Sequence, residues 1–430
     1  MQIVAVPLFN KDMMVEAYMF RYLKENNLFS KAQATNIFDG ASHSEALETL
    51  DYVGLEAFTL GKPLFIPIND IMLMGSLEKQ CKEPPEKLIF VFENPLKKEQ
   101  MPLYLPIIQN LCNMGYRFAC NYPYDFQKQD PVLACCSYIF LSQREERKEQ
   151  TEKILGEIKA YFPALVPIAV HIYNNDTLKS LYAKEYAMYE SRFYKIPPGR
   201  NKGEVPPLKA DAIRLINTVQ DDGFEFEKVA DIVQGDPALT ILLLKIINAP
   251  TYGSRDTIKT IAQAVSLLGV QEVRKWVTTA VYKSLADDRP SEITKISLIR
   301  AKFAENLASF YKLDSMAGQI YLMGLFSAID IILHLPLPEA LSLVNVSEVI
   351  SSALLEGKGE LAPVLKMVTD YENANWSSVS RHIIVNDIKE DALSKAYIDA
   401  LIWYRNTTLQ ESEPTVLAEG MAGSAAPTAG

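Results

Sequence analysis

Short apolar runs alternate with amphipathic segments along the first 195 residues. The segments between the runs have helical spacing of their apolar positions, as in Pro106–Met114, where Pro106 is expected in the first turn, and Glu145–Tyr161. Strand–helix units of roughly 30 residues predict a parallel α/β domain, and some six to eight of them allow a closed barrel. The runs expected as strands are Ile3–Val6, Pro63–Ile68, Lys87–Phe92, Tyr116–Cys120, Tyr138–Leu141 and Leu165–Ile172.

The pattern changes at residues 196–207, a stretch rich in Pro and Gly without apolar periodicity, which predicts a linker. Apolar residues then recur at helical spacing, so residues 208–405 are predicted to form an all-α domain. Residues 406–430 are small and polar and are expected to be disordered. The first helices expected after the linker are Leu208–Asp221, Phe226–Gln234, Pro237–Ala249 and Ile258–Leu268.

Composition argues against several classes of protein. The 430 residues carry a net charge of -10, which argues against a nucleic-acid binder, because such proteins need a basic surface to displace counterions. The five cysteines show no CxxC spacing and are expected as reduced, buried thiols, typical of a cytoplasmic protein. No signal peptide and no apolar run of about 18–20 residues is present, so no membrane span is expected.

Motifs that carry chemistry are scarce. The four histidines lie in no metal-binding pattern, and neither GxGxxG nor a phosphate-binding P-loop occurs, so no metal and no cofactor is predicted. Glu93 directly follows the strand ending at Phe92, where barrels place ligand-binding residues, although a carboxylate at a helix start is the simpler interpretation. Asp330 lies in an otherwise apolar helix, where an internal cap or ion pair is expected.

The helical half contains a specific set of motifs. Asp236 and Pro237 open a D-P-x-L helix start, Asn248 and Gly253 shape a tight turn, and Gly269 ends the next expected helix. These residues resemble the signature of HDOD domains, which are similar to HD phosphohydrolases without their metal ligands. In the segment that resembles the G-L-L-H-D-I-G motif of active HD enzymes, Ser327 and Ala328 stand in place of His and Asp. The resemblance therefore implies no phosphohydrolase activity.

The N-terminal half resembles, more weakly, an EAL-type barrel, the fold of cyclic di-GMP phosphodiesterases. Ala17-Tyr18-Met19-Phe20-Arg21 falls where E-x-L-x-R is expected, so Ala17 replaces the metal-binding Glu. Glu16 lies one residue away and should point to the other face of the strand. Arg21 is retained, and its guanidinium can meet a phosphate.

Most other catalytic positions of the EAL family are also changed. Glu93 keeps one carboxylate of the paired E-x-x-E, and Asn69 lies near the lost Asn position, on the same strand face. Hydrolysis with two metal ions needs several carboxylates, so the resemblance implies an inactive barrel. The replaced positions are Pro67 for Asn, Asn121 and Tyr122 for the paired aspartates, Phe140 for the catalytic Lys, His171 for Glu, and Glu190 for Gln.

The sequence thus favours a cytoplasmic, non-enzymatic EAL–HDOD protein of bacterial signal transduction that acts by binding a protein partner. The family suggests roles in motility or surface attachment. The alternative is a cyclic di-GMP receptor that uses Arg21 and Glu93 without hydrolysis. An active phosphodiesterase has the least support. Homodimer formation stays open. Trp276 is expected to be a core residue, and the alternative is an exposed binding anchor.

Overall fold

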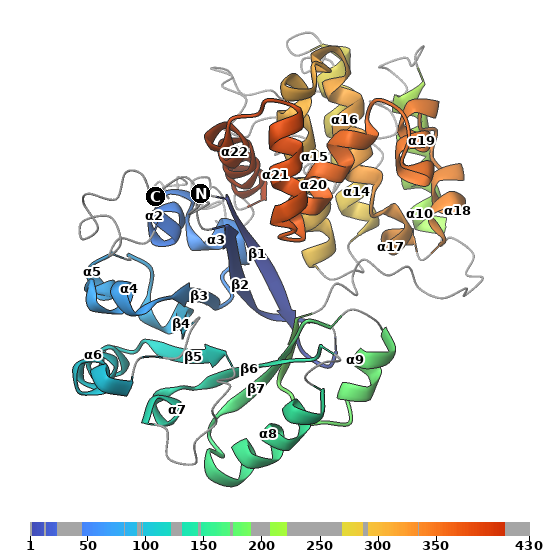
Figure 1. Cartoon of the computed structure of the whole chain (residues 1–430). Helices are drawn as coiled ribbons and strands as arrows, with labels where there is room; N and C mark the ends of the chain where they lie inside the picture. The colour runs from blue at the N-terminus through green and yellow to red at the C-terminus, as the bar shows by residue number, and fades with distance from the viewer. Residues whose placement is uncertain are drawn as a thin grey trace, which may run out of the picture.

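The computed structural model describes two parts of the chain, an N-terminal barrel and a C-terminal group of helices that packs against it (Figure 1). The predicted fold class, a (β/α) barrel followed by a helical domain, is confirmed. The predicted linker and tail lie almost wholly outside the described residues. Those residues are 2–12, 14–23, 45–80, 82–92, 96, 98–121, 131–144, 148–172, 175–190, 207–221, 269–286, 291–333 and 335–408.

Eight strands form one closed barrel in the order β1 to β8. The first two strands are antiparallel, whereas β2 to β8 run parallel, each to the next. β1 closes the barrel by pairing with β8 only at Leu8 and Phe9. The strands are β1 Gln2–Phe9, β2 Val15–Leu23, β3 Leu64–Ile68, β4 Leu88–Phe92, β5 Arg117–Asn121, β6 Tyr138–Ser142, β7 Val166–Val170 and β8 Met188–Glu190.

All six strands predicted from apolar runs are present, within a few residues of their expected ends. The apolar runs did not predict β2 or β8. β8 is too short to produce a distinct apolar run. Pro106 is not in the first turn of its helix. α6 begins at Met101, so Pro102 lies in the first turn and Pro106 lies inside the helix. Pro106 is exposed, so the carbonyl group that loses its backbone partner there lies on the solvent side.

The helices of the barrel follow its strands in the chain and cover the outer face of its sheet (Figure 1). Each is amphipathic or short, and their buried side chains belong to the main apolar core. They are α2 Glu45–Val53, α3 Leu55–Thr59, α4 Asp70–Met74, α5 Leu77–Gln80, α6 Met101–Asn113, α7 Pro131–Cys135, α8 Lys148–Tyr161 and α9 Asn175–Leu181, with 3₁₀ turns at Pro85–Lys87 and Lys98–Gln100.

Every strand contributes apolar side chains to the lumen, because alternate residues of a strand point inward. In the lumen, the ring of Phe65 meets the rings of Phe140 and Tyr138 edge-on at 5.2 Å in both cases. The barrel interior is therefore a packed core. It consists of Leu8, Ala17, Met19, Phe65, Ile89, Val91, Ala119, Phe140, Ile168, Val170 and Met188.

The C-terminal part is helical throughout its described residues. α22 extends to Thr408, past the predicted domain end at residue 405. No described helix combines the length and the apolarity that crossing a bilayer would require. The helices are α10 Pro207–Gln220, α14 Val270–Leu285, α15 Ser291–Leu307, α16 Ala317–Phe326, α17 Ile329–Leu333, α18 Leu337–Ser342, α19 Glu348–Glu356, α20 Ala362–Glu372, α21 Trp376–Val385 and α22 Glu390–Thr408, with 3₁₀ turns at Ala308–Tyr311 and Asp314–Met316.

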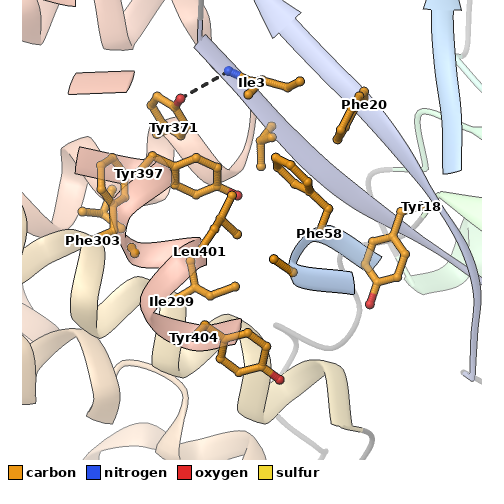
Figure 2. Packing of buried hydrophobic residues seen from close by; sticks show 14 of the residues in the cluster. Ile3, Tyr18, Phe20, Phe58, Ile299, Phe303, Tyr371, Tyr397, Leu401 and Tyr404 are labelled. Carbon is orange, nitrogen blue, oxygen red and sulfur yellow. Dashed lines mark hydrogen bonds between the residues drawn. The ribbon is translucent and has the colours of Figure 1, made fainter. Parts of the chain in front are cut away.

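The helical domain covers the outer face of the β1–β2 hairpin. β1 ends at Phe9 and β2 begins at Val15, so no helix fits between these two strands. Instead α20 and α22 contact β1, and the backbone N–H of Ile3 donates to the hydroxyl of Tyr371 at 3.2 Å (Figure 2). The apolar core runs without interruption from the barrel into the helices. The helices thus take the position that a barrel helix would otherwise occupy.

Candidate functional site

A cavity of about 400 Å³ lies between the carboxyl ends of the barrel strands and the helical domain. Barrel enzymes place their active sites at this end of the sheet. The barrel contributes Arg21, Arg144, His171 and Glu190, all at or just beyond the ends of their strands. The helical domain contributes side chains from α15, α22 and the region around the end of α20, including Glu292, Lys295 and Glu372.

Arg21 forms an ion pair inside the barrel mouth. Its guanidinium donates to both carboxylate oxygens of Glu190 at 3.0 Å. The two residues are 169 positions apart in the sequence. The backbone N–H of His171 adds a bond to Glu190 at 3.3 Å, and the His171 ring contacts the Ser142 hydroxyl at 3.0 Å. Burial raises the pKa of Glu190, but the charges of Arg21 and His171 outweigh it and leave that pKa below its usual value.

The sequence singles out Arg21 but gives no sign of its partner. Glu190 stands there only in place of Gln, because nothing in the sequence pairs two residues so far apart. Closure of the barrel places Glu190, the last residue of β8, beside Arg21 of β2. The guanidinium that was expected to meet a phosphate therefore meets a carboxylate of the same chain. Glu93, the other predicted ligand residue, lies outside the described residues.

Residues at or near the positions that the EAL resemblance compares with catalytic residues take part in packing and hydrogen bonds. Ala17 is buried in the apolar lumen, and Glu16 is exposed, where it accepts a hydrogen bond from the Asn10 side chain at 2.7 Å. Glu16 thus points away from the lumen, as predicted. Asn69 caps α4 by accepting from the N–H of Met72 at 2.8 Å. Within the residues that the structure describes, no three His, Cys, Asp or Glu side chains gather as a metal site would need.

A buried arginine lies beside the segment that resembles the HD motif. Arg300 forms two hydrogen bonds with the Glu372 carboxylate, at 2.9 and 2.7 Å. It also donates to the Ser327 hydroxyl at 2.7 Å, beside Ala328. Arg300, Ser327 and Ala328 line a second cavity of about 200 Å³ together with Asp330, whose pKa is raised by burial. A guanidinium thus lies where the resemblance to HD enzymes would place metal ligands.

The described residues test only part of the expected HDOD signature. Asp236, Pro237, Asn248 and Gly253 lie outside them. Gly269 has a φ of 81° and precedes α14 as its N-cap, a conformation that favours glycine.

The interpretation of Trp276 as an exposed anchor is wrong, because its side chain is only 1% exposed. The four described cysteines are free thiols. Cys112 and Cys135 are only half-buried, in contrast to the expectation of full burial.

Comparison with known proteins identifies the helical domain. The HDOD domain family model matches residues 205–348. The chain is 24% identical to the uncharacterized protein YuxH of Bacillus subtilis over 408 residues, which cover 93% of this chain and 97% of YuxH. It is also 24% identical over 218 residues to the cyclic di-GMP phosphodiesterase CdgJ of Vibrio cholerae, an alignment that covers 51% of this chain and 50% of CdgJ.

Among solved structures, a standalone EAL protein of Vibrio cholerae O395 in its c-di-GMP-bound form matches with a TM-score of 0.32 and 14% identity, covering 45% of this chain and 90% of that protein. The FimX EAL domain of Xanthomonas citri matches with a TM-score of 0.32 and 12% identity, covering 45% and 87%. Scores this low carry no weight for this chain. The family match and the closed barrel establish that this chain joins an N-terminal eight-stranded barrel to a C-terminal region containing an HDOD domain.

Proposed function

We propose that this chain is a non-catalytic protein of bacterial signal transduction that acts by binding a protein partner. The observation that carries the proposal is the Arg21–Glu190 pair at the mouth of an apolar barrel lumen. Hydrolysis of a phosphodiester by two metal ions needs several carboxylates that face one point. At this mouth, the Glu190 carboxylate is held by an arginine, and Phe140 fills the position expected for a catalytic lysine.

The HDOD domain supports the same conclusion. Ser327 and Ala328 offer neither an imidazole nor a carboxylate, and Arg300 brings a positive charge to the place where a cation would bind. The cyclic di-GMP phosphodiesterase CdgJ aligns with about half of this chain. That alignment associates the chain with cyclic di-GMP signalling, while the changed residues argue against cleavage.

The second candidate function is a cyclic di-GMP receptor, and the cavity at the barrel mouth is the observation that favours it. Its volume of about 400 Å³ is within the usual range for small-molecule sites, about 300–1,000 Å³. However, the three glutamates that line the same cavity pair with Arg21, Lys295 and Arg300. A ligand with two phosphates requires more uncompensated positive charge than these paired cations supply. Partner binding is therefore the preferred proposal.

Two measurements on the full chain test the proposal. Cyclic di-GMP is incubated with the protein and Mg²⁺ or Mn²⁺, and linear product is measured. Calorimetric titration then measures binding, with Arg21→Gln as the matched variant. We expect neither cleavage nor binding. Cleavage by the purified protein would refute the non-catalytic proposal, and micromolar binding that Arg21→Gln abolishes would replace partner binding with the receptor function.

A further inference from the structure

The cavity at the barrel mouth contains three internal ion pairs that neutralise its carboxylates. All three glutamates that line it contact a cationic side chain, one from the barrel and two from α15. Two of the cations, Arg21 and Lys295, also line this cavity, whereas Arg300 lines the second cavity. The pairs are Glu190 with Arg21 at 3.0 Å, Glu292 with Lys295 at 3.6 Å, and Glu372 with Arg300 at 2.7 Å.

Arg144 is the third lysine or arginine that lines the cavity, besides Arg21 and Lys295. It follows β6 at the barrel mouth and is exposed. Among the described residues Arg144 has no ion pair and no hydrogen bond, whereas Arg21 and Lys295 each pair with a glutamate. Of the described lysine and arginine side chains that line the cavity, Arg144 is therefore the one without a counter-charge. A bound molecule with one negative charge would supply that counter-charge.

Part of the cavity lining is aromatic and apolar. Phe20, Phe58 and Tyr397 line it together with Ile299 and Leu401, and Figure 2 shows these side chains facing one another between the barrel and the helices. Rings of this kind favour a flat aromatic body, which they can contact by stacking or edge-on. Because the walls come from both domains, an occupant would contact both at once.

We propose that this cavity binds a small organic anion with a single negative charge and a flat aromatic ring system. The anionic group pairs with Arg144 at the rim, and the ring lies between the domains. The inference rests on the proposed function, because it supplies the input of a protein that does not cleave cyclic di-GMP. It also separates this site from one for cyclic di-GMP, whose two phosphates would leave one negative charge without a partner.

The test uses the full chain and three named probes with one negative charge each. Cyclic AMP and cyclic GMP carry the negative charge on a phosphodiester, whereas 4-hydroxybenzoate carries it on a carboxylate. The probes therefore show which of these two anionic groups the cavity binds. Calorimetric titration measures each affinity, and cyclic di-GMP serves as the doubly charged comparison. We expect saturable binding of at least one probe at one site per chain, and weaker binding at higher salt.

Variants at the rim distinguish this site from adventitious binding. Arg144→Gln should weaken binding at least tenfold, Arg144→Glu should abolish it, and Arg144→Lys should keep the affinity within a few-fold. Lys153→Gln, at an exposed cation of α8 outside the cavity, is the matched control and should change nothing. All these changes are at exposed side chains, so folding is preserved.

Three outcomes would overturn the inference. They are no binding of any of the three probes, binding that Arg144→Gln leaves unchanged, and tighter binding of cyclic di-GMP than of every probe. Cleavage of cyclic di-GMP, measured separately, would refute the proposed function instead, so the two failures are distinguishable.

Discussion

Replacement of Lys295 by Met tests how the two domains are held together. Lys295 and Glu292, both on α15, are 3% and 2% exposed at the interface with the barrel. The Lys295 ammonium donates to the carbonyl oxygen of Phe58 at 2.6 Å and lies 3.9 Å from the ring centroid of Tyr18. The Tyr18 hydroxyl in turn donates to Glu292. One lysine thus connects α15 to both β2 and α3.

The expected magnitude follows from burial. Without Lys295, Glu292 is a buried carboxylate whose counter-charge is gone, and the Phe58 carbonyl loses its donor. Removing one partner of a buried pair typically costs about 3–5 kcal/mol. The double change Glu292→Leu with Lys295→Met removes both charges and should recover most of that loss, because apolar replacements of buried pairs are often neutral or stabilising. Recovery should be incomplete, because an unsatisfied buried carbonyl still costs about 1–3 kcal/mol.

Urea unfolding provides the assay. The three tryptophans, Trp276, Trp376 and Trp403, all lie in the helical domain, so their fluorescence reports on that domain, whereas circular dichroism reports on the whole chain. The two transitions should coincide in the wild type and separate in Lys295→Met. A loss below about 1 kcal/mol in the single variant, or a double variant as unstable as the single one, would refute the reasoning.

Three further predictions concern packing, pH and domain autonomy. Gly324→Ala should lower the free energy of unfolding in urea by about 1–3 kcal/mol, because a Cβ there would lie 2.7 Å from the backbone of α15. Gly318 is in the same helix and has open space around it, so Gly318→Ala should be neutral or stabilising. The pKa of Glu190 is lowered in the folded state, so its contribution is present above its ordinary pKa of 4.5 and is lost as pH falls through the lowered value; the stability difference between wild type and Glu190→Gln should therefore shrink between about pH 6 and pH 3, and a constant difference would contradict this. A barrel fragment ending at residue 206 would expose Tyr18 and Phe20, so it should aggregate or remain partly unfolded on size-exclusion chromatography, whereas a monodisperse, folded fragment would show that the helices are dispensable.

The interface also bears on where a partner can bind. The outer face of the β1–β2 hairpin and the facing side of α15 are buried against each other, so neither is available to another protein while the domains are joined. Partner studies should therefore use the full chain. A separated domain would offer an apolar surface that the intact protein covers.

The sequence by itself determined the local elements and the residue types of the site. Runs such as Leu88–Phe92 are apolar throughout because parallel barrel strands are buried on both faces, and a pattern of this kind is visible without a structure. The resemblance of the segments around Ala17, Ser327 and Ala328 to family motifs is likewise visible in the sequence, because each motif is local.

Tertiary structure decided which of these residues meet. Arg21 and Glu190 are 169 positions apart, and only closure of the barrel makes them an ion pair. Lys295 looks like an ordinary surface lysine of a helix in the sequence, yet docking of the domains buries it against Phe58 and Tyr18. Local sequence patterns indicate which secondary structure each segment favours, whereas contacts between distant segments depend on how the whole chain packs.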